Sequence, residues 1–170
     1  MNEFHTHSQI LPCRAAMQGF SLLEVLVALL VLSVGLLGLA GLSAKGMNSN
    51  QSAYYLSQAM VQAYDMADRM RANRAGFAAG NYDSISGTGS DPGCISTGCA
   101  TASQIAQYDA NRWNTTNANL LPAGQGKVTI QAGNIRIITV MWDEDRTGAT
   151  GTACGGGSAD LTCFSTSFVP

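Results

Sequence analysis

The chain has 170 residues, which is enough for one ordinary domain and one membrane element. Charged residues make up only 12% of it and the formal net charge is −2, with Lys and Arg scattered along the chain, so bulk electrostatics do not predict a nucleic-acid-binding protein. So few charges, combined with abundant glycine, are typical of a loop-rich domain outside the cytoplasm.

The first predicted element is an apolar helix. Residues 25–44 carry no charge, and about twenty helical residues span roughly 30 Å, the thickness of the hydrocarbon core of a bilayer. One carboxylate, Glu24, lies at the edge of this run. It is either a functional group whose charge needs a partner within the membrane or a first-turn residue that the helix dipole stabilises. The residues alone leave both interpretations open.

A short motif stands directly before the apolar run, where residues 19–24 read Gly-Phe-Ser-Leu-Leu-Glu. With the apolar run behind it, this motif resembles the class III signal of type IV prepilins and pseudopilins. The resemblance implies that a prepilin peptidase cuts between Gly19 and Phe20 on the cytoplasmic side, and that the new N-terminal Phe20 is then N-methylated. It also implies a role in assembly for Glu24, which would pair with the protonated N-terminal amine of a neighbouring subunit.

Residues 1–19 are therefore expected to be a prepilin leader that does not belong to the fold. His5 and His7 within it fit a disposable polar leader better than a metal site. The alternative is an ordinary secretory signal that is cut after Ala40. Such a signal needs a clearly positive region directly before its apolar run, and Arg14 alone supplies little charge there.

Helical periodicity continues beyond the apolar run, so residues 20–44 are predicted as the transmembrane or filament-core half of one helix and residues 45–75 as its amphipathic half. The whole helix, ending between Asn73 and Gly76, would be about 84 Å long. Asp65 and Arg69 form an i,i+4 pair on its polar side. The predicted core face comprises Leu56, Ala59, Met60, Ala63, Met66, Ala67 and Met70, and the predicted opposite side comprises Gln58, Gln62, Asp65, Asp68 and Arg69.

The remaining residues, 76–170, are predicted to form a small globular head. Little regular structure is indicated before Ala100, and residues 101–113 then predict a short helix capped by Thr101 or Ser103. Residues 127–132 and 135–142 predict an antiparallel hairpin around a two-residue Gly-Asn turn, and residues 162–169 a last strand. The predicted fold class is α+β, with a small antiparallel sheet packed on the C-terminal half of a long N-terminal helix.

Cysteine usage predicts two disulfides. Loss of the leader removes Cys13 and leaves four cysteines, and an even number outside the cytoplasm indicates disulfide bonds rather than zinc. Of the three connectivities, the sequence favours Cys94 with Cys99 and Cys154 with Cys163, the pairs that are nearest along the chain.

The sequence does not predict an enzyme or a cofactor. Without the leader the chain has no histidine, so Ser-His-Asp triads, Cys-His pairs and His-ligated zinc are excluded. The carboxylates of residues 143–145 suit a solvated turn better than a calcium site or a glycosidase pair. Arg69, Arg71 and Arg74 are explained more simply by the negative end of a helix than by contact with DNA.

Motifs in the head carry a second resemblance. Residues 68–73 read Asp-Arg-Met-Arg-Ala-Asn, Gln104 to Asp109 follow the first cysteine pair, and residues 138–142 read Ile-Thr-Val-Met-Trp. Together with Trp113 and the segment Leu121-Pro122…Gly124…Gly126, they look like the PilV-type minor pilins. The resemblance implies a low-abundance type IV pilus subunit that acts in the initiation of assembly and affects adhesion or motility.

The partners that this resemblance implies are the prepilin peptidase/N-methyltransferase, other minor and major pilins, and the inner membrane. The precursor would reside in the bacterial inner membrane with its head facing the periplasm, and then in the pilus at the cell surface. Two alternatives remain at this point: a minor pseudopilin of a type II secretion system, and a membrane-tethered extracytoplasmic binding module.

Overall fold

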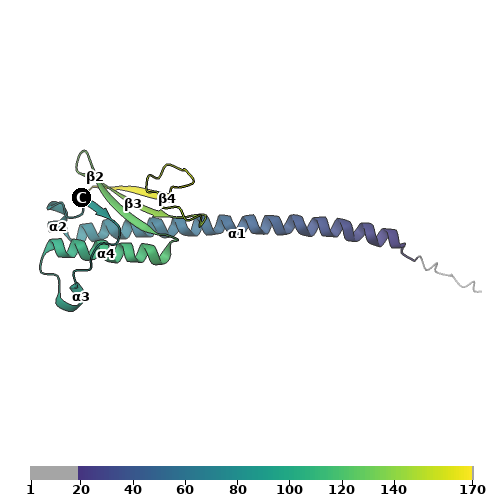
Figure 1. The fold of residues 1–170 in the computed structure, drawn as a ribbon, viewed down its shortest axis with the longest axis horizontal. Helices are drawn as coiled ribbons and strands as arrows, with labels where there is room; N and C mark the ends of the chain where they lie inside the picture. The colour runs from purple at the N-terminus through teal and green to yellow at the C-terminus, as the bar shows by residue number, and fades with distance from the viewer. Residues whose placement is uncertain (1–18, 170) are drawn as a thin grey trace, which may run out of the picture. The chain divides into compact units, whose positions relative to one another are not determined.

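The fold is described from a computed structural model, in which residues 19–169 are placed (Figure 1). The predicted leader, with His5, His7 and Cys13, lies outside the described residues apart from Gly19. The chain divides into two compact units, one ending at Lys45 and one beginning at Gly46, and each is described by itself.

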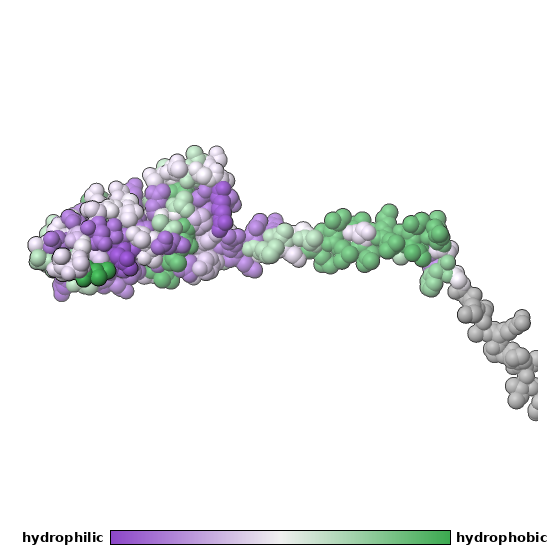
Figure 2. All heavy atoms as spheres, turned by 60° about the horizontal axis from the view of Figure 1, so that its bottom comes forward, coloured by the Kyte–Doolittle hydropathy of each residue, from purple (hydrophilic) through white to green (hydrophobic). Residues whose placement is uncertain are grey.

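The described residues of the first unit form the N-terminal part of helix α1 (Leu22–Ala72) and the three residues before it. Every residue from Gly19 to Lys45 is exposed, and most of these side chains are large and apolar, as the green surface in Figure 2 shows. α1 contains a stretch with a mean hydropathy of 2.7, which is long and apolar enough to cross a membrane.

The second unit combines helices with an antiparallel sheet, and the predicted α+β class is confirmed. The sheet has the order β1-β2-β3-β4, so each strand pairs with the one that follows it in sequence. It lies along the C-terminal part of α1, and α4 runs beside that helix (Figure 1). The elements after α1 are α2 (Arg74–Ala78), β1 (Ser84–Ser86), α3 (Cys94–Thr97), α4 (Ala102–Leu120), β2 (Gln125–Gln131), β3 (Ile135–Trp142) and β4 (Thr162–Phe168).

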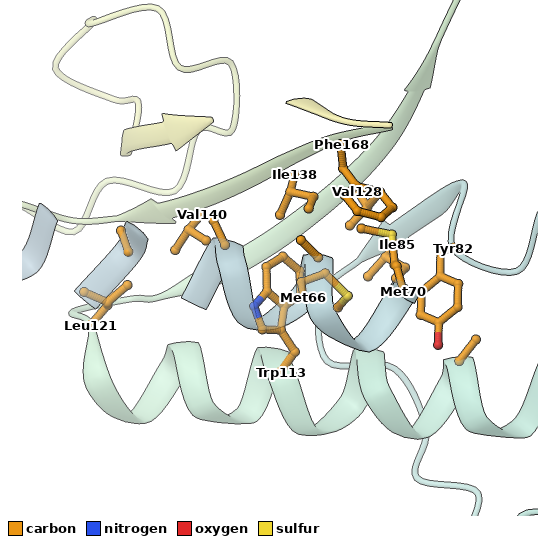
Figure 3. Packing of buried hydrophobic residues seen from close by; sticks show 14 of the residues in the cluster. Met66, Met70, Tyr82, Ile85, Trp113, Leu121, Val128, Ile138, Val140 and Phe168 are labelled. Carbon is orange, nitrogen blue, oxygen red and sulfur yellow. The ribbon is translucent and has the colours of Figure 1, made fainter. Parts of the chain in front are cut away.

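The core of the second unit lies between α1, α4 and the sheet. Met66 of α1 and Trp113 of α4 face Ile138 and Val140 of β3, and all four are fully buried (Figure 3). The indole N–H of Trp113 donates a hydrogen bond of 2.8 Å to the backbone oxygen of Gln62. This bond fixes α4 against α1 and satisfies the one polar group of a buried tryptophan.

The buried face of α1 is rotated relative to the prediction. Leu56 is 42% exposed although it was expected in the core, and Gln62 is 7% exposed although it was expected on the opposite side. Tyr55, which the predicted face did not include, is buried. The reason is that α4 lies against the flank of α1 that carries Gln62. The hydrogen bond from Trp113 to the backbone oxygen of Gln62 joins the two helices there.

Two further boundaries differ from the prediction. α4 begins after its cap Thr101, with the reciprocal capping box formed by Gln104, but it continues to Leu120 rather than ending at Trp113. The β2–β3 connection has three residues rather than two, because Gln131 pairs with Ile135. Gly133 and Asn134 within it both have positive φ, a conformation that glycine and asparagine adopt more readily than other residues.

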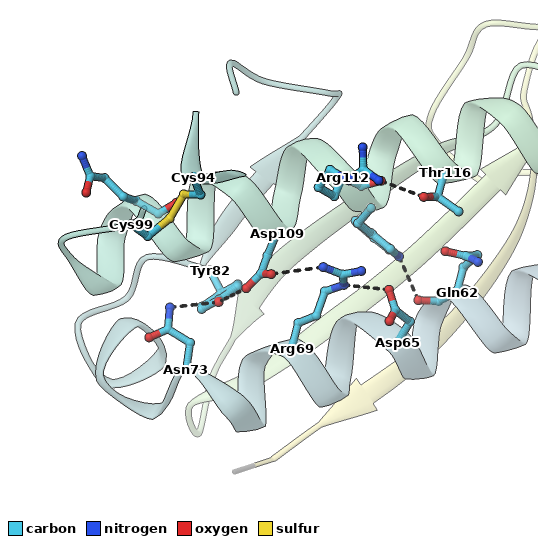
Figure 4. A network of polar contacts seen from close by, with 12 residues as sticks. Gln62, Asp65, Arg69, Asn73, Tyr82, Cys94, Cys99, Asp109, Arg112 and Thr116 are labelled. Atoms are coloured by element: carbon cyan, nitrogen blue, oxygen red, sulfur yellow. Dashed lines mark hydrogen bonds and ion pairs between the residues drawn. A yellow bond between two sulfur atoms is a disulfide. The ribbon is translucent and has the colours of Figure 1, made fainter. Parts of the chain in front are cut away.

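A polar network links α1, α4 and the segment before β1 (Figure 4). Arg69 pairs with Asp65 at 2.7 Å and with Asp109 at 3.2 Å. The Tyr82 hydroxyl donates to Asp109 at 2.6 Å and accepts from the Asn73 amide at 3.0 Å. Tyr82 is fully buried, and burial together with the bond to Asp109 raises the pKa of its phenol.

We expect Tyr82→Phe to destabilise the second unit by about 1–3 kcal/mol near neutral pH, because it removes the donor to the buried Asp109 carboxylate. A phenol whose pKa is raised on folding stabilises the folded state fully below its unfolded pKa of about 10, and that contribution is lost as the pH rises further. The measurement is urea unfolding of the full-length protein in detergent at pH 8 and pH 11, with Tyr64→Phe, an exposed tyrosine, as the control. A difference between wild type and Tyr82→Phe that does not shrink at pH 11 would contradict this account.

Gly126 of β2 has no room for a side chain, since a Cβ there would overlap the Trp113 indole. Gly126→Ala should therefore cost about 1–3 kcal/mol by overpacking, as read from a thermal or urea transition. The matched control is Gly46→Ala, because Gly46 lies in α1 with open space around it. It should be neutral or slightly stabilising, since alanine is the better helix former.

Candidate functional site

The helix start is defined by Ser21. Its hydroxyl oxygen accepts a hydrogen bond of 3.1 Å from the backbone N–H of Glu24, and its carbonyl accepts from the N–H groups of Glu24 and Val25 at 3.1 and 3.3 Å. Ser21 is thus the N-cap of α1, and Glu24 stands at the position that a capping box reserves for Glu or Gln. This cap was not among the predicted features, although the spacing Ser-x-x-Glu is its usual signal.

Gly19 and Phe20 lie outside the helix. Both are exposed, and Phe20 has 82% of its surface in contact with solvent. Their peptide bond therefore has no helical hydrogen bonds around it and is accessible, as a peptidase requires of a substrate.

Glu24 lies in the first turn of α1 and is exposed. The positive end of the helix dipole stabilises a carboxylate there. Within the described residues no side chain bonds to this carboxylate, which leaves it available to a group outside this part of the chain.

The four cysteines of the second unit are joined as Cys94–Cys99 and Cys154–Cys163, with Cα atoms 4.7 and 5.6 Å apart. The first bridge closes the turn that contains α3 (Figure 4). The second fastens the long loop after β3 to the second residue of β4. Across residues 19–169 no group of three or more His, Cys, Asp or Glu side chains is placed to hold a metal ion.

The carboxylates that follow β3 serve the fold of their own loop. Asp143 accepts from the backbone N–H of Gly148 at 2.7 Å and from the backbone and hydroxyl of Thr147 at 3.1 and 3.3 Å. Burial by itself would raise the pKa of Asp143, but these hydrogen bonds outweigh it and hold the pKa below its usual value. Glu144 accepts from the indole N–H of Trp142.

The arginines near the end of α1 are engaged within the chain. Arg69 bridges Asp65 and Asp109, while Arg71 pairs with Asp68 at 2.5 Å. The Arg71 guanidinium also lies 4.9 Å from the ring centre of Phe168. These contacts account for two of the three arginines that were weighed for nucleic-acid contact.

The residues with predicted roles fall into two groups that lie in different units. Gly19, Phe20 and Glu24 stand at the beginning of α1, whereas the four cysteines stabilise loops of the second unit. The exposed, charge-free residues 25–44 follow a motif whose Ser21 caps α1, in one chain with a disulfide-bonded α+β unit. This is the organisation that the resemblance to type IV prepilins implies.

Comparison with known families identifies the class. A family model for the prokaryotic N-terminal methylation motif matches residues 14–40, and a family model described as type IV pilin Tt1218 matches residues 41–111. The chain belongs to the type IV prepilin family, whose members are structural proteins and not enzymes. No curated protein and no solved structure matches the chain.

The family has direct consequences for processing. The methylation motif implies processing by a prepilin peptidase and assembly with other pilins, and the apolar helix behind it indicates a membrane-anchored precursor.

The Asp143 loop gives a prediction on acid stability. A carboxyl whose pKa is lowered on folding stabilises the folded state above its unfolded pKa of about 4, and this contribution is lost as the pH falls through the lower, folded value. Asp143→Asn should therefore lower the melting temperature at pH 7, and its difference from wild type should shrink below about pH 4. Asp145→Asn, at an exposed position in the same turn, is the control and should leave the melting temperature unchanged at both pH values.

Proposed function

We propose that this chain is a PilV-type minor subunit of a type IV pilus that acts in the initiation of pilus assembly. The observation that carries the proposal is the exposed, charge-free stretch of α1, residues 25–44, which directly follows the Gly-Phe-Ser-Leu-Leu-Glu motif, in a chain whose following residues match a type IV pilin family. Such a helix has to be covered by lipid or by other helices, because apolar surface on this scale is unfavourable in water.

The minor-pilin assignment is supported by the roles of the head residues that carry that resemblance. Asp109 joins the Arg69 network, Trp113 fills the core, and Gly126 makes room for its indole. Trp142 is buried at the end of β3. Because these residues determine how the head packs, their match to the PilV-type motifs supports a head fold shared with those minor pilins rather than a chance similarity in sequence.

The proposed sequence of events begins in the inner membrane, with residues 76–170 forming a head on the periplasmic side. The prepilin peptidase hydrolyses the Gly19–Phe20 bond, which frees the amine of Phe20 for N-methylation. The Glu24 carboxylate then pairs with the N-terminal amine of an adjacent subunit. Because an unpaired charge in an apolar environment is costly, this pair favours the axial register in which it forms.

The first test is the N-terminal residue and the intact mass of the protein extracted from membranes and from sheared pili. We expect a start at N-methylated Phe20 in both. A start at Met1 would show that the precursor is not processed, and a start at Gly41 would show an ordinary secretory signal.

Glu24→Gln separates processing from assembly, since amide and carboxylate have nearly the same size. The variant should still be cut after Gly19 but should be depleted from pili. A deletion strain then distinguishes the pilus from a secretion system: we expect reduced piliation and twitching with unchanged type II secretion, and the reverse result would identify a pseudopilin.

A further inference from the structure

β4 forms one edge of the sheet, so one side of its backbone faces away from β3 (Figure 1). It pairs with β3 without a break from Thr162 to Phe168. Among residues 19–169, no backbone group outside this ladder bonds to residues 162–168. Alternate N–H and C=O groups of β4 therefore point outward. An extended polypeptide can satisfy such a row of groups in register, because it presents donors and acceptors at the same spacing.

β4 has none of the features by which edge strands usually avoid such pairing. Between Thr162 and Phe168 there is no charged residue and no proline, and the unbroken register contains no bulge. The opposite edge is protected by its shortness, because β1 has only three residues. Cys163, near the start of β4, is joined by its disulfide to the preceding loop. The part of the edge that is open to another strand is therefore Phe164 to Phe168.

The side chains of β4 divide between the two faces of the sheet. Phe164 and Phe168 lie on the core side, where Phe168 is buried and Phe164 is half-buried. Ser165 and Ser167 lie on the other side and are exposed. A strand that pairs with β4 would therefore continue an apolar surface on the core side and a small polar surface on the other.

The sequence of this open segment reads the same in both directions. Residues 164–168 are Phe-Ser-Thr-Ser-Phe, with Thr166 at the centre. In an antiparallel pair of two such strands centred on Thr166, every residue lies opposite a residue of the same type and on the same face. Phe164 of one copy meets Phe168 of the other, and Ser165 meets Ser167. Aromatic pairs and hydroxyl pairs across strands stabilise a sheet, and no two like charges face each other here.

We propose that β4 is a self-association surface, at which a second copy of this chain pairs antiparallel about Thr166. The sheets of the two copies then join into one continuous sheet. The contact is isologous, since both copies use the same strand. One pair of strands buries little surface compared with the interface of a stable dimer. The association is therefore weak and depends on a high local concentration of the protein.

The direction of β4 determines how the two copies are arranged. The last residue of β4, Phe168, lies 4.9 Å from the guanidinium of Arg71, whereas Arg146, in the loop before β4, donates to the hydroxyl of Tyr55. β4 therefore runs in the same direction as the C-terminal part of α1, and antiparallel pairing turns these helix parts in opposite directions. Subunits within one helical filament are related by heterologous contacts, so the pairing joins heads of two different pili. This last step rests on the proposed function, but the pairing itself does not.

The decisive experiment compares two variants that are changed at the same exposed positions. In Ser165→Lys/Ser167→Lys, each introduced ammonium group would lie opposite another one across the strand pair. In Ser165→Lys/Ser167→Glu, each ammonium group would lie opposite a carboxylate. Both variants lose the hydrogen bond of 2.9 Å between Ser165 and Thr139, so this effect on the head is matched. The full-length proteins are studied in detergent micelles, in which two copies are free to take opposite orientations.

Sedimentation over a range of protein concentrations gives the dissociation constant of the dimer. We expect the wild type to dimerise, and the dissociation constant of Ser165→Lys/Ser167→Lys to be about tenfold larger than that of Ser165→Lys/Ser167→Glu. Equal constants for the two variants would show that the chains associate through another surface, such as the apolar residues 25–44. A wild type that stays monomeric at every concentration would also overturn the proposal.

Hydrogen exchange locates the contact in the unaltered chain, without reliance on the folding of a variant. The backbone amides of residues 164–168 should exchange more slowly as the protein concentration rises, because pairing gives the outward N–H groups an acceptor. Those of β1, at the opposite edge, should exchange at a rate that does not depend on concentration. Protection that appears at β1 instead of β4, or at neither strand, would contradict the proposal.

Failure of the pairing can be distinguished from failure of the proposed function. If the wild type pairs through β4 but is absent from sheared pili, the pairing stands and the proposed function is wrong. If the wild type is present in sheared pili but stays monomeric in micelles, the proposed function stands and the pairing is wrong.

Discussion

The structure depends on the exclusion of charge from one long stretch of helix. An uncharged helix of about twenty residues is stable in lipid because its backbone hydrogen bonds are satisfied internally and almost all of its side chains are apolar. Of the two polar side chains in this stretch, Ser33 and Ser43, the Ser33 hydroxyl donates to the backbone oxygen of Leu29. The same helix in water would expose a continuous apolar surface, which drives association. Residues 25–44 therefore require either a bilayer or other helices. A pilin meets the bilayer as a membrane-anchored precursor and other helices when it assembles with other pilins.

The second unit has to form a stable fold from few residues. A sheet of four strands has one face to cover, and the C-terminal part of α1 together with α4 covers it. Two disulfides restrain the loops that contribute little to the core, and cross-links of this kind act mainly by limiting the freedom of the unfolded chain. The network of Arg69, Asp109 and Tyr82 makes the packing of the elements specific. Its members bond well only when α1, α4 and the segment before β1 are correctly placed.

Local patterns were sufficient to predict most elements but not how they face one another. The apolar run, the hairpin and the Thr101 cap are visible as composition, alternation and spacing within a few residues. The burial of Gln62 and Tyr55 depends on α4, which lies far away in sequence, so helical periodicity in α1 put Gln62 on the opposite side and did not include Tyr55 in the core face. The length of α4 was missed because the inward residues after Trp113 are Asn114 and Asn117, both buried. In the sequence, a polar residue on the buried face of a helix cannot be told from a solvent-exposed one until its hydrogen-bond partner is known. Here the side-chain oxygen of Asn114 accepts from the backbone N–H of Gly126 at 2.5 Å.

The cap at Ser21 also determines what proteolysis does to the chain. The serine that caps the helix and the N–H group that it binds are both on the C-terminal side of the Gly19–Phe20 bond. Among residues 19–169, hydrolysis at that bond would break no hydrogen bond of α1, and it would leave the Ser21 cap of the first turn in place. In the proposed processing, cleavage at this bond changes the charge at the start of the helix, from a neutral amide to a cationic amine, while the Ser21 cap is retained.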